Sequence, residues 1–333
     1  MTDQRNAGEI LALKDVAQRV VFAVALVSLA VSAQAQTFPS GPISVVVPLA
    51  PGDAADVSAR AMGEEISRLL NTPVIAVNRP GAGGALGTSS VVKAKKDGQT
   101  ILFAPNAALI FRAVLDPQSA SYDAQRDLVP LGIASRTPSV LAVRSDAPHR
   151  NLAELIEHSN KNPGRINIGH PGTGSVSDFG VRLINALAGV ELVPVPHTGA
   201  APAIAALRGG HIDGVVLALG ALSTHIKAGT FRGIVASNRV PEFADIPTLR
   251  ELGYPEELFG IWFAFLAPAG IPEEARQALV GAVEQAVKAP AIAAKLAPLG
   301  ILQSYAGPEQ MTAEIREEFK RVSDMARKTG LGK

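Results

Sequence analysis

Short apolar runs alternate with helix-like segments along most of this chain, and that rhythm constrains its fold more than any other feature. Residues 43–47, 74–77 and 100–104 are apolar runs of strand length, separated by segments whose apolar residues recur with helical spacing. Neighbouring strands that are joined by a single helix run parallel, because a parallel pair needs a crossover connection. The pattern therefore predicts an α/β fold built on parallel sheets.

The same rhythm returns in a second part of the chain, with strands predicted at residues 166–169, 192–195, 215–219 and 233–237. Extended residues 128–135 and 139–144 precede this second set, and an apolar strand at 259–266 follows it. We interpret these segments as crossings between two lobes, near residues 138–142 and 255–262. Two lobes joined by two crossings form a hinge, which suits the capture of a ligand by closure.

The beginning of the chain has the pattern of a signal peptide. Basic residues, of which Arg19 is the last, precede an apolar stretch at residues 20–31, and Ala33-Gln34-Ala35 supplies the small residues of a cleavage site. The apolar stretch is shorter than the roughly 20 residues that cross a bilayer. We expect cleavage after Ala35 and a soluble mature protein in the periplasm; an uncleaved membrane anchor is the alternative.

The predicted organisation follows from these crossings. Residues 36–139 form the first part of lobe 1, residues 140–257 form lobe 2, and residues 258–333 return to lobe 1 with a strand and terminal helices. The chain of 333 residues is long enough for two such lobes.

Composition excludes several classes of function. The 31 basic and 30 acidic residues nearly cancel, so no net charge draws the chain to nucleic acid. The absence of cysteine removes disulfides, thiolate metal sites and a cysteine nucleophile. No histidine pair has metal-binding spacing, so we expect neither a metal nor a cofactor, and a monomer is the default expectation.

Glycine-containing loops follow predicted strands and directly precede helices at residues 48–56, 78–84, 169–178 and 196–201. In open α/β sheets, ligands bind beyond the carboxyl ends of the strands. Helix N-termini there present free N–H groups and a partial positive charge that suit an anion. The alternative is that the glycines only make tight turns, but their recurrence in both predicted lobes favours a binding site.

Several motifs occur in a fixed order from residue 39 to residue 270. They include Pro48-Leu49-Ala50-Pro51-Gly52, Asn78-Arg79-Pro80-Gly81-Ala82-Gly83-Gly84, Gly172-Thr173-Gly174-Ser175, Pro196-His197-Thr198-Gly199 and Asp245-Ile246-Pro247-Thr248. In this series the chain resembles the receptors of tripartite tricarboxylate transporters, the Bug or TctC-like family. The resemblance implies a two-lobed periplasmic-binding-protein fold of the Venus flytrap, type II-like class. It also implies a small carboxylate ligand held by backbone amides, hydroxyls and waters, and a membrane permease as partner.

The loops and the resemblance together predict the ligand contacts, which lie in three of the glycine-containing loops and at the end of the third strand. They are Leu49, Gly52, Asp53, Ala54, Asp56, Asn106, Gly172, Thr173, Gly174, Ser175, Ser177, His197, Thr198 and Gly199.

Several of these positions depart from the family's usual pattern. Asp53 stands where a second glycine is common, and Ala55 stands where a hydroxyl residue is common. Leu217 and Ala218 replace a frequent Asp-Ser pair, or are simply core residues. A less polar pocket with an added acid disfavours a multi-carboxylate ligand, so we expect a monocarboxylate, an amino-bearing acid or an aromatic acid. The alternative role of Asp53 is an N-cap of the helix that follows.

Two other functions compete with the transport receptor. A sensory receptor of the same fold, signalling to a membrane sensor kinase, would use the same lobes. A periplasmic hydrolase would need an activated nucleophile, for which Ser175 or Ser177 near His170 are the candidates. The sequence has no G-x-S-x-G elbow, so we interpret both serines as binding hydroxyls.

Overall fold

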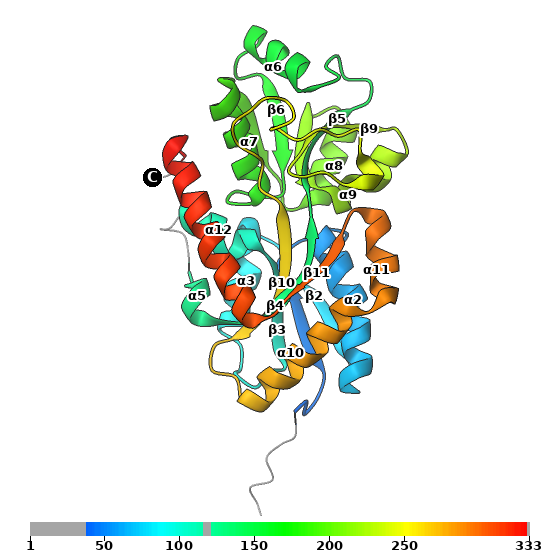
Figure 1. Ribbon diagram of the computed structural model, residues 1–333, viewed down its shortest axis with the longest axis vertical. Coiled ribbons are helices and arrows are strands. Elements are labelled where there is room, and N and C mark those ends of the chain that lie inside the picture. The colour runs from blue at the N-terminus through cyan, green and yellow to red at the C-terminus, as the bar shows by residue number, and fades with distance from the viewer. Residues whose placement is uncertain (1–37, 116–120, 332–333) are drawn as a thin grey trace, which may run out of the picture. The chain divides into compact units, whose positions relative to one another are not determined.

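Strands of the described residues form two separate mixed sheets, one of six strands and one of five (Figure 1). The computed structural model describes residues 38–115 and 121–331, so the predicted signal peptide at residues 1–35 lies outside the described residues. Both sheets belong to one compact unit, Gly41–Lys333.

The six-stranded sheet has the order β11-β4-β10-β3-β1-β2. Its strands are β1 (Ile43–Val47), β2 (Val74–Asn78), β3 (Thr100–Pro105), β4 (Leu128–Thr137), β10 (Ile261–Pro268) and β11 (Leu302–Ala306). The five-stranded sheet has the order β7-β6-β8-β5-β9. Its strands are β5 (Ser139–Arg144), β6 (Ile166–His170), β7 (Leu192–Pro196), β8 (Gly214–Ala218) and β9 (Phe231–Ala236).

Helices occupy most of the remaining described chain. Those associated with the six-stranded sheet are α2 (Ala54–Leu70), α3 (Ala85–Val92), α4 (Arg112–Leu115), α5 (Ala124–Asp127), α10 (Glu273–Lys288), α11 (Pro290–Leu296) and α12 (Pro308–Lys328). Those of the five-stranded sheet are α6 (Leu152–Lys161), α7 (Val176–Ala188), α8 (Ala200–Arg208) and α9 (Leu219–Lys227). Short 3-10 helices are η1 (Ala82–Gly84), η4 (Pro241–Phe243) and η5 (Ala297–Leu299), and η2 (Ala107–Phe111) is a short π-helix.

The parallel pairing expected from the βα rhythm is present among three strands of each sheet. Strand β1 pairs parallel with β2 and β3, and β6 pairs parallel with β7 and β8. The sheets are mixed overall, because β4, β10 and β11 pair antiparallel in one sheet, as do β5, β8 and β9 in the other. None of these antiparallel neighbours is consecutive in the described chain, so a single crossover helix does not fix their direction.

The chain passes from one sheet to the other at two places. Only Pro138 separates β4 of the six-stranded sheet from β5 of the five-stranded sheet, and residues 237–260 lead back from β9 to β10. The Ser139 hydroxyl donates to the Phe259 carbonyl over 2.7 Å, and the Ser237 hydroxyl accepts the Ser139 N–H over 3.2 Å. Hydrogen bonds therefore tie the two crossings side by side, as a hinge requires.

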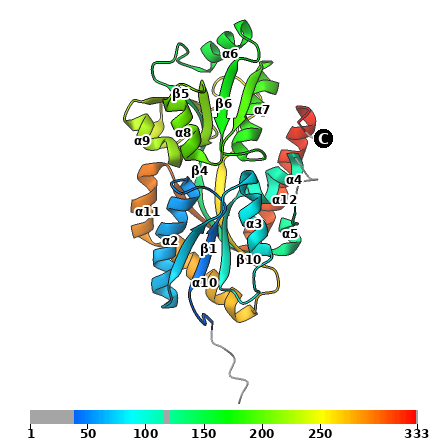
Figure 2. The ribbon, with the colours of Figure 1, turned by 180° about the vertical axis from the view of Figure 1, so that it is seen from behind.

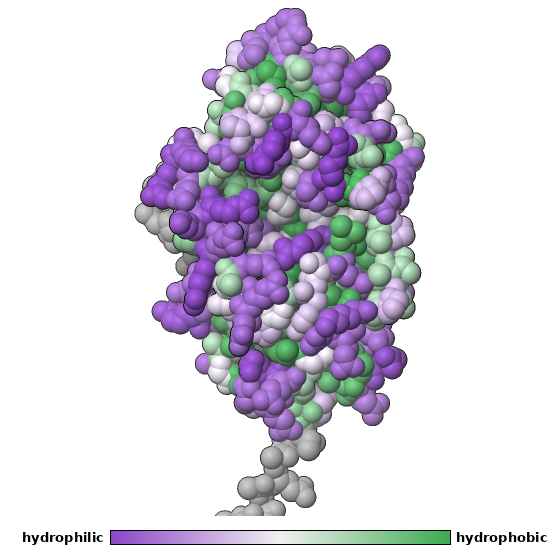
Figure 3. Space-filling model, viewed as in Figure 1, coloured by the Kyte–Doolittle hydropathy of each residue, from purple (hydrophilic) through white to green (hydrophobic). Residues whose placement is uncertain are grey.

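Helices cover both faces of the six-stranded sheet. Helices α10 and α12 cross the face seen in Figure 1 and contact β4, whereas α3 contacts β1 and β3 on the face seen in Figure 2. Charged and polar residues dominate the outer surface in the view of Figure 3, with small apolar patches between them. Most apolar residues of the inner strands are buried between these layers, whereas Ile75 of β2 and Leu302 of β11, on the two edge strands, are exposed.

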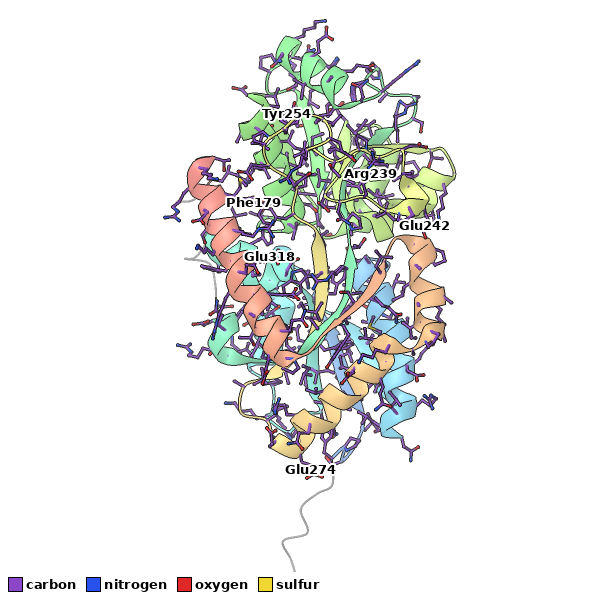
Figure 4. The ribbon with its side chains drawn as sticks, viewed as in Figure 1. Phe179, Arg239, Glu242, Tyr254, Glu274 and Glu318 are labelled. Carbon is purple, nitrogen blue, oxygen red and sulfur yellow. The ribbon has the colours of Figure 1, made fainter. Side chains whose placement is uncertain are left out.

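Aromatic side chains join the two sheets next to the return crossing. Phe179, on α7, lies with its ring centroid 5.5 Å from those of Phe111 and Phe259, each in an edge-to-face arrangement (Figure 4). Phe111 precedes α4, so the cluster draws together the six-stranded sheet, the five-stranded sheet and the chain between them.

Local signals explain several helix ends. Asn151 caps α6, because its side-chain oxygen accepts the Glu154 N–H over 2.9 Å. Pro308 occupies the first turn of α12, whereas Pro272 is the N-cap of α10 and lies outside its first turn. Within the described residues, no helix is both long and apolar enough to span a membrane.

Candidate functional site

The first turn of α7 presents hydrogen-bond donors. Ser175 is its N-cap, and the hydroxyl oxygen accepts the Asp178 N–H over 3.0 Å, so its own hydrogen stays free to donate. The Ser177 hydroxyl is buried and has no hydrogen-bond partner among the described residues. The N–H groups of Val176 and Ser177 belong to the first turn, which has no intrahelical acceptor for them. This helix start therefore suits an anion.

The first turn of α2 presents an acid instead. Asp53 is its N-cap, and one carboxylate oxygen accepts the Ala55 N–H over 3.0 Å. The side chain is only 5% exposed, and no cation of the described chain pairs with it. Burial, and next the nearby Asp56 carboxylate, raise the pKa of Asp53 from 3.8 to about 6, although the bond from Ala55 opposes the shift.

An inner cavity lies between these two helix starts. Its walls come from both sheets, and it offers about 30 Å³ to the centre of a water-sized sphere, enough for two or three such groups. Its lining residues are Leu49, Asp53, Gly83, Pro105, Ala107, Pro171, Ser175, Val176, Ser177, Leu217, Ala218, Ile261 and Phe263. Most of these side chains are apolar, so the polar groups of Asp53, Ser175 and Ser177 dominate the chemistry of the cavity.

An outer groove of about 490 Å³ adjoins the inner cavity and shares Leu49, Gly83 and Pro171 with it. All four of the glycine-containing loops contribute to its walls. The groove is lined by Leu49, Gly81, Ala82, Gly83, Gly84, Pro171, Gly172, Thr173, Pro196, His197, Thr198 and Pro202. The loops predicted to converge are thus brought together in the structure, on two connected hollows.

The backbones at Gly83 and Thr173, which belong to loops of different sheets, approach each other closely beside the cavity. A Cβ atom built on Gly83 would lie 2.4 Å from the Thr173 carbonyl oxygen, too short for any real side chain. Gly83 also has a φ of 61°, in the left-handed region that glycine adopts at little cost. Glycine at this position therefore permits the closed arrangement.

The structure places the predicted ligand contacts in three groups. The inner cavity is lined by Leu49, Asp53, Ser175 and Ser177. The outer groove is lined by Leu49, Gly172, Thr173, His197 and Thr198. Neither hollow is lined by Gly52, Ala54, Asp56, Asn106, Gly174 and Gly199. The assignment of all these residues to ligand binding stays a prediction.

Two of the residues outside the hollows serve the loops themselves. The Asp56 carboxylate accepts the Gly52 N–H over 3.0 Å, and it also bonds Arg60 and Asn78. These donors hold the pKa of Asp56 below its usual value against the opposing and largest effect of burial. The Gly174 N–H donates to the Asp178 carboxylate over 2.9 Å. Because each group already has its partner, it shapes the loop that carries the cavity wall.

Asn106 also turns away from the inner cavity. Its side-chain amide donates to the Gly260 carbonyl over 3.1 Å and to Glu318 over 2.8 Å. Glu318, on α12, is labelled in Figure 4. Pro105 and Ala107 on either side of it line the cavity. Asn106 therefore fastens the end of β3 to the return crossing and to α12.

Trp262 also bonds Glu318, through the indole N–H over 2.5 Å, which favours core packing over contact with a ligand. Its neighbours Ile261 and Phe263 line the inner cavity, and neither was predicted from the sequence. Side chains on a strand point alternately to its two faces, so a strand at the cleft turns either Trp262 or its two neighbours toward the cavity. This alternation is the signal that could have identified them.

The two loop histidines do not activate a serine. His170 is buried, its Nδ1 lies 3.0 Å from the Gly172 carbonyl oxygen, and its Nε2 lies 3.8 Å from the Asp178 carboxylate. Burial lowers the pKa of His170 despite that carboxylate. His197 Nδ1 lies 3.0 Å from the Val195 carbonyl oxygen. No serine of the inner cavity hydrogen-bonds either imidazole in the described chain, so the hydrolase arrangement is missing there.

With the geometry established, comparison with known proteins identifies the family. The model of the tripartite tricarboxylate transporter family receptor matches residues 58–331, which is most of the chain. The chain belongs to this receptor family. Its resemblance to the Bug and TctC-like receptors and the two-lobed periplasmic-binding-protein fold are thereby confirmed.

Individual members of the family are similar over nearly the whole length. Protein BugT of Bordetella pertussis is 30% identical over 309 residues, covering 92% of this chain and 95% of BugT. The structure of Rpa4515 from R. palustris with adipate has a TM-score of 0.84 and 26% identity, covering 89% of this chain and 99% of that one. MatC from Rhodopseudomonas palustris with bound malate has a TM-score of 0.81 and 29% identity, covering 86% and 99%. The two structures solved with a ligand hold the small carboxylates adipate and malate.

Proposed function

We propose that this receptor captures a small carboxylate in the inner cavity and delivers it to a membrane permease of the tripartite type. The observation that carries the proposal is the first turn of α7, where two serine hydroxyls and two free N–H groups surround one end of the cavity. A carboxylate accepts hydrogen bonds from both kinds of donor, and the helix start adds a partial positive charge.

Three further observations support the proposal. Adipate and malate occupy family members of similar fold. The cavity walls come from both sheets, so a ligand there favours the closed arrangement over an open one. The histidines that a hydrolase would use are engaged with backbone carbonyls, which favours binding without chemistry.

The proposal extends to location and organisation. Residues 1–35 direct export to the periplasm, where the permease receives the ligand. Residues 36–139 and 258–333 act as one lobe and residues 140–257 as the other, and they move about the crossings at Pro138 and residues 237–260.

A thermal-shift screen tests the proposal. Mono-, di- and tricarboxylates, amino acids and aromatic acids are added to the mature protein, and matched amides that lack a carboxylate serve as controls. A ligand at 100 times its Kd stabilises the folded state by about 2.7 kcal/mol, which raises Tm by several degrees. A carboxylate that raises Tm while its amide does not supports the proposal, and silence across the panel overturns it.

A further inference from the structure

The inner cavity has polar lining groups of two opposite kinds. The donors of the α7 start and the Asp53 carboxylate at the start of α2 both line it. The rest of the lining is mainly apolar and includes Leu217 and Phe263, which are fully or almost fully buried. A ligand of more than about two or three heavy atoms extends from the cavity into the adjoining outer groove, and inside the cavity it meets both donors and an acceptor.

Asp53 is the acid of this region that is left without a counter-ion. Asp56, three residues further on, has an ion pair with Arg60 at 2.9 Å, and Asp178 has one with Arg182 at 2.8 Å. Asp53 receives only the Ala55 N–H, and the charged group that acts on it, Asp56, is also an acid. A buried carboxylate without a cation costs several kcal/mol, so the site is incomplete until a positive group arrives.

We infer that Asp53 selects a zwitterionic ligand, one whose carboxylate lies at the α7 start and whose ammonium group pairs with the Asp53 carboxylate. The inference rests on the proposed function and names the ligand class for the same cavity. An ammonium group neutralises the unpaired acid, and a second carboxylate at that position would repel it. Asp53 is thus a specificity-determining residue, and this chain favours amino acids over the dicarboxylates found in MatC and Rpa4515.

Two matched series of compounds test the inference. β-Alanine, butanoate and succinate share one carboxylate and a two-carbon spacer, and they end in an ammonium, a methyl and a second carboxylate. 4-Aminobutanoate, pentanoate and glutarate repeat the comparison with one more carbon. Titration calorimetry is run on the wild-type protein, on Asp53→Asn and on Asp53→Ser. Asparagine and serine both cap a helix, so the start of α2 is kept in both variants.

We expect the order of affinities within a series to reverse between the wild-type protein and the two Asp53 variants. The wild-type protein binds the amino compound of at least one series at least tenfold more tightly than either partner. In Asp53→Asn and Asp53→Ser the amino compound loses at least tenfold in affinity, and the dicarboxylate of that series gains. Glu64→Gln is the control, because it removes one negative charge from the exposed face of the same helix and leaves the ranking unchanged.

The results that would contradict the role of Asp53 differ from those that would contradict the capture of carboxylates. A wild-type protein that binds succinate or glutarate as tightly as the amino compound, or a preference that survives in both Asp53 variants, overturns the role of Asp53 and leaves the capture of carboxylates intact. If none of the six compounds binds the wild-type protein or either variant, this inference is overturned, and the wider thermal-shift panel then decides the proposed function separately.

Discussion

Helices α2 and α7 begin with the same arrangement of hydrogen bonds and ion pairs, and residues at both starts line the inner cavity. Each has an aspartate at its third position that accepts the N–H of the glycine before the N-cap, over 3.0 Å in α2 and 2.9 Å in α7. Each aspartate also pairs with an arginine four residues later on the same helix. The two loops are therefore held in the same way, although they belong to different sheets.

The difference lies at the N-cap and at the second helical position. At the N-cap, α2 has Asp53 and α7 has Ser175; at the second helical position, α2 has Ala55 and α7 has Ser177. One start therefore offers an acid and the other offers hydroxyl donors. The glycine–aspartate hydrogen bond and the Asp–Arg pair hold each loop in place. The residues at the N-cap and the second helical position then decide whether that part of the cavity favours a positive or a negative ligand group.

Making both helix starts acidic is the strongest test of this comparison. Ser175→Asp keeps an N-cap but places a carboxylate at the donor end of the cavity. As a general scale, two like unit charges in contact, about 4 Å apart, repel by about 4 kcal/mol at an effective dielectric constant near 20. We expect the affinity for any bound carboxylate to fall more than 100-fold, as measured by titration calorimetry.

A matched variant controls for the added charge. Asn151→Asp introduces the same charge at the N-cap of α6, whose residue is exposed and lines neither hollow. Binding in this control should match the wild-type protein. An Ser175→Asp protein that binds carboxylates with wild-type affinity would show that the α7 start does not hold the ligand.

Removing the acid from the α2 start should stabilise the unliganded protein. The pKa of Asp53 is about 6 in the folded state and about 3.8 in the unfolded chain, so between these values the folded state holds a proton that the unfolded state has lost. The free energy of unfolding therefore falls as the pH rises through this window, by roughly 3 kcal/mol for about two pKa units. Asp53→Asn lacks this penalty, and denaturation should find it more stable at pH 8.

The pH dependence of this gain is the decisive part of the measurement. The two proteins should differ by about 3 kcal/mol at pH 8 and approach equal stability only below the unfolded-state pKa, near pH 3, where Asp53 is protonated in both states. Equal stability at pH 8, or a difference that grows as the pH falls, would contradict the burial of an unpaired acid at this helix start.

Local signals in the sequence predicted much of this arrangement. The βα rhythm located the strands that carry the loops, and Asp53 was foreseen as a possible N-cap of α2. The pairing of Asp56 with Arg60 was not predicted, although i, i+4 spacing is a local signal for an ion pair on a helix. The hydrogen bond of Asn106 to Glu318 was not predicted either, because Glu318 lies 212 residues further along the chain. Contacts of that range depend on how the return strand and α12 pack, which no local pattern records.

The contrast between the two helix starts matters for binding only if both face the same cavity while the two sheets are close together. Gly83→Ala would place a Cβ atom 2.4 Å from the Thr173 carbonyl oxygen, so the two sheets could not approach as closely. We expect ligand affinity to fall about tenfold, equivalent to about 1.4 kcal/mol. Gly229→Ala is the control, because Gly229 has a similar φ of 70° and open space around it.

Both glycine variants should lose about 1 kcal/mol of stability, since alanine is strained at a positive φ. Affinity measurements then separate closure from backbone strain. Equal affinities in the two variants would show that the approach of Gly83 to Thr173 is not needed for binding.

The smallest expected effect concerns the second helical position, where α7 has Ser177 and α2 has Ala55. Ser177→Ala makes the two positions alike and deletes a buried hydroxyl that has no hydrogen-bond partner in the described chain. Stability should therefore stay within about 0.5 kcal/mol of the wild-type protein, or rise slightly, because no hydrogen bond is broken. Ligand affinity should fall about fivefold, equivalent to about 1 kcal/mol for one lost hydrogen bond.

Ser159→Ala deletes another buried, unpartnered hydroxyl, on α6 outside both hollows, and should change neither quantity. If Ser177→Ala bound the ligand as tightly as the wild-type protein, the donors of α7 would be reduced to the N-cap and the backbone, and the two helix starts would differ only through Asp53 and Ser175.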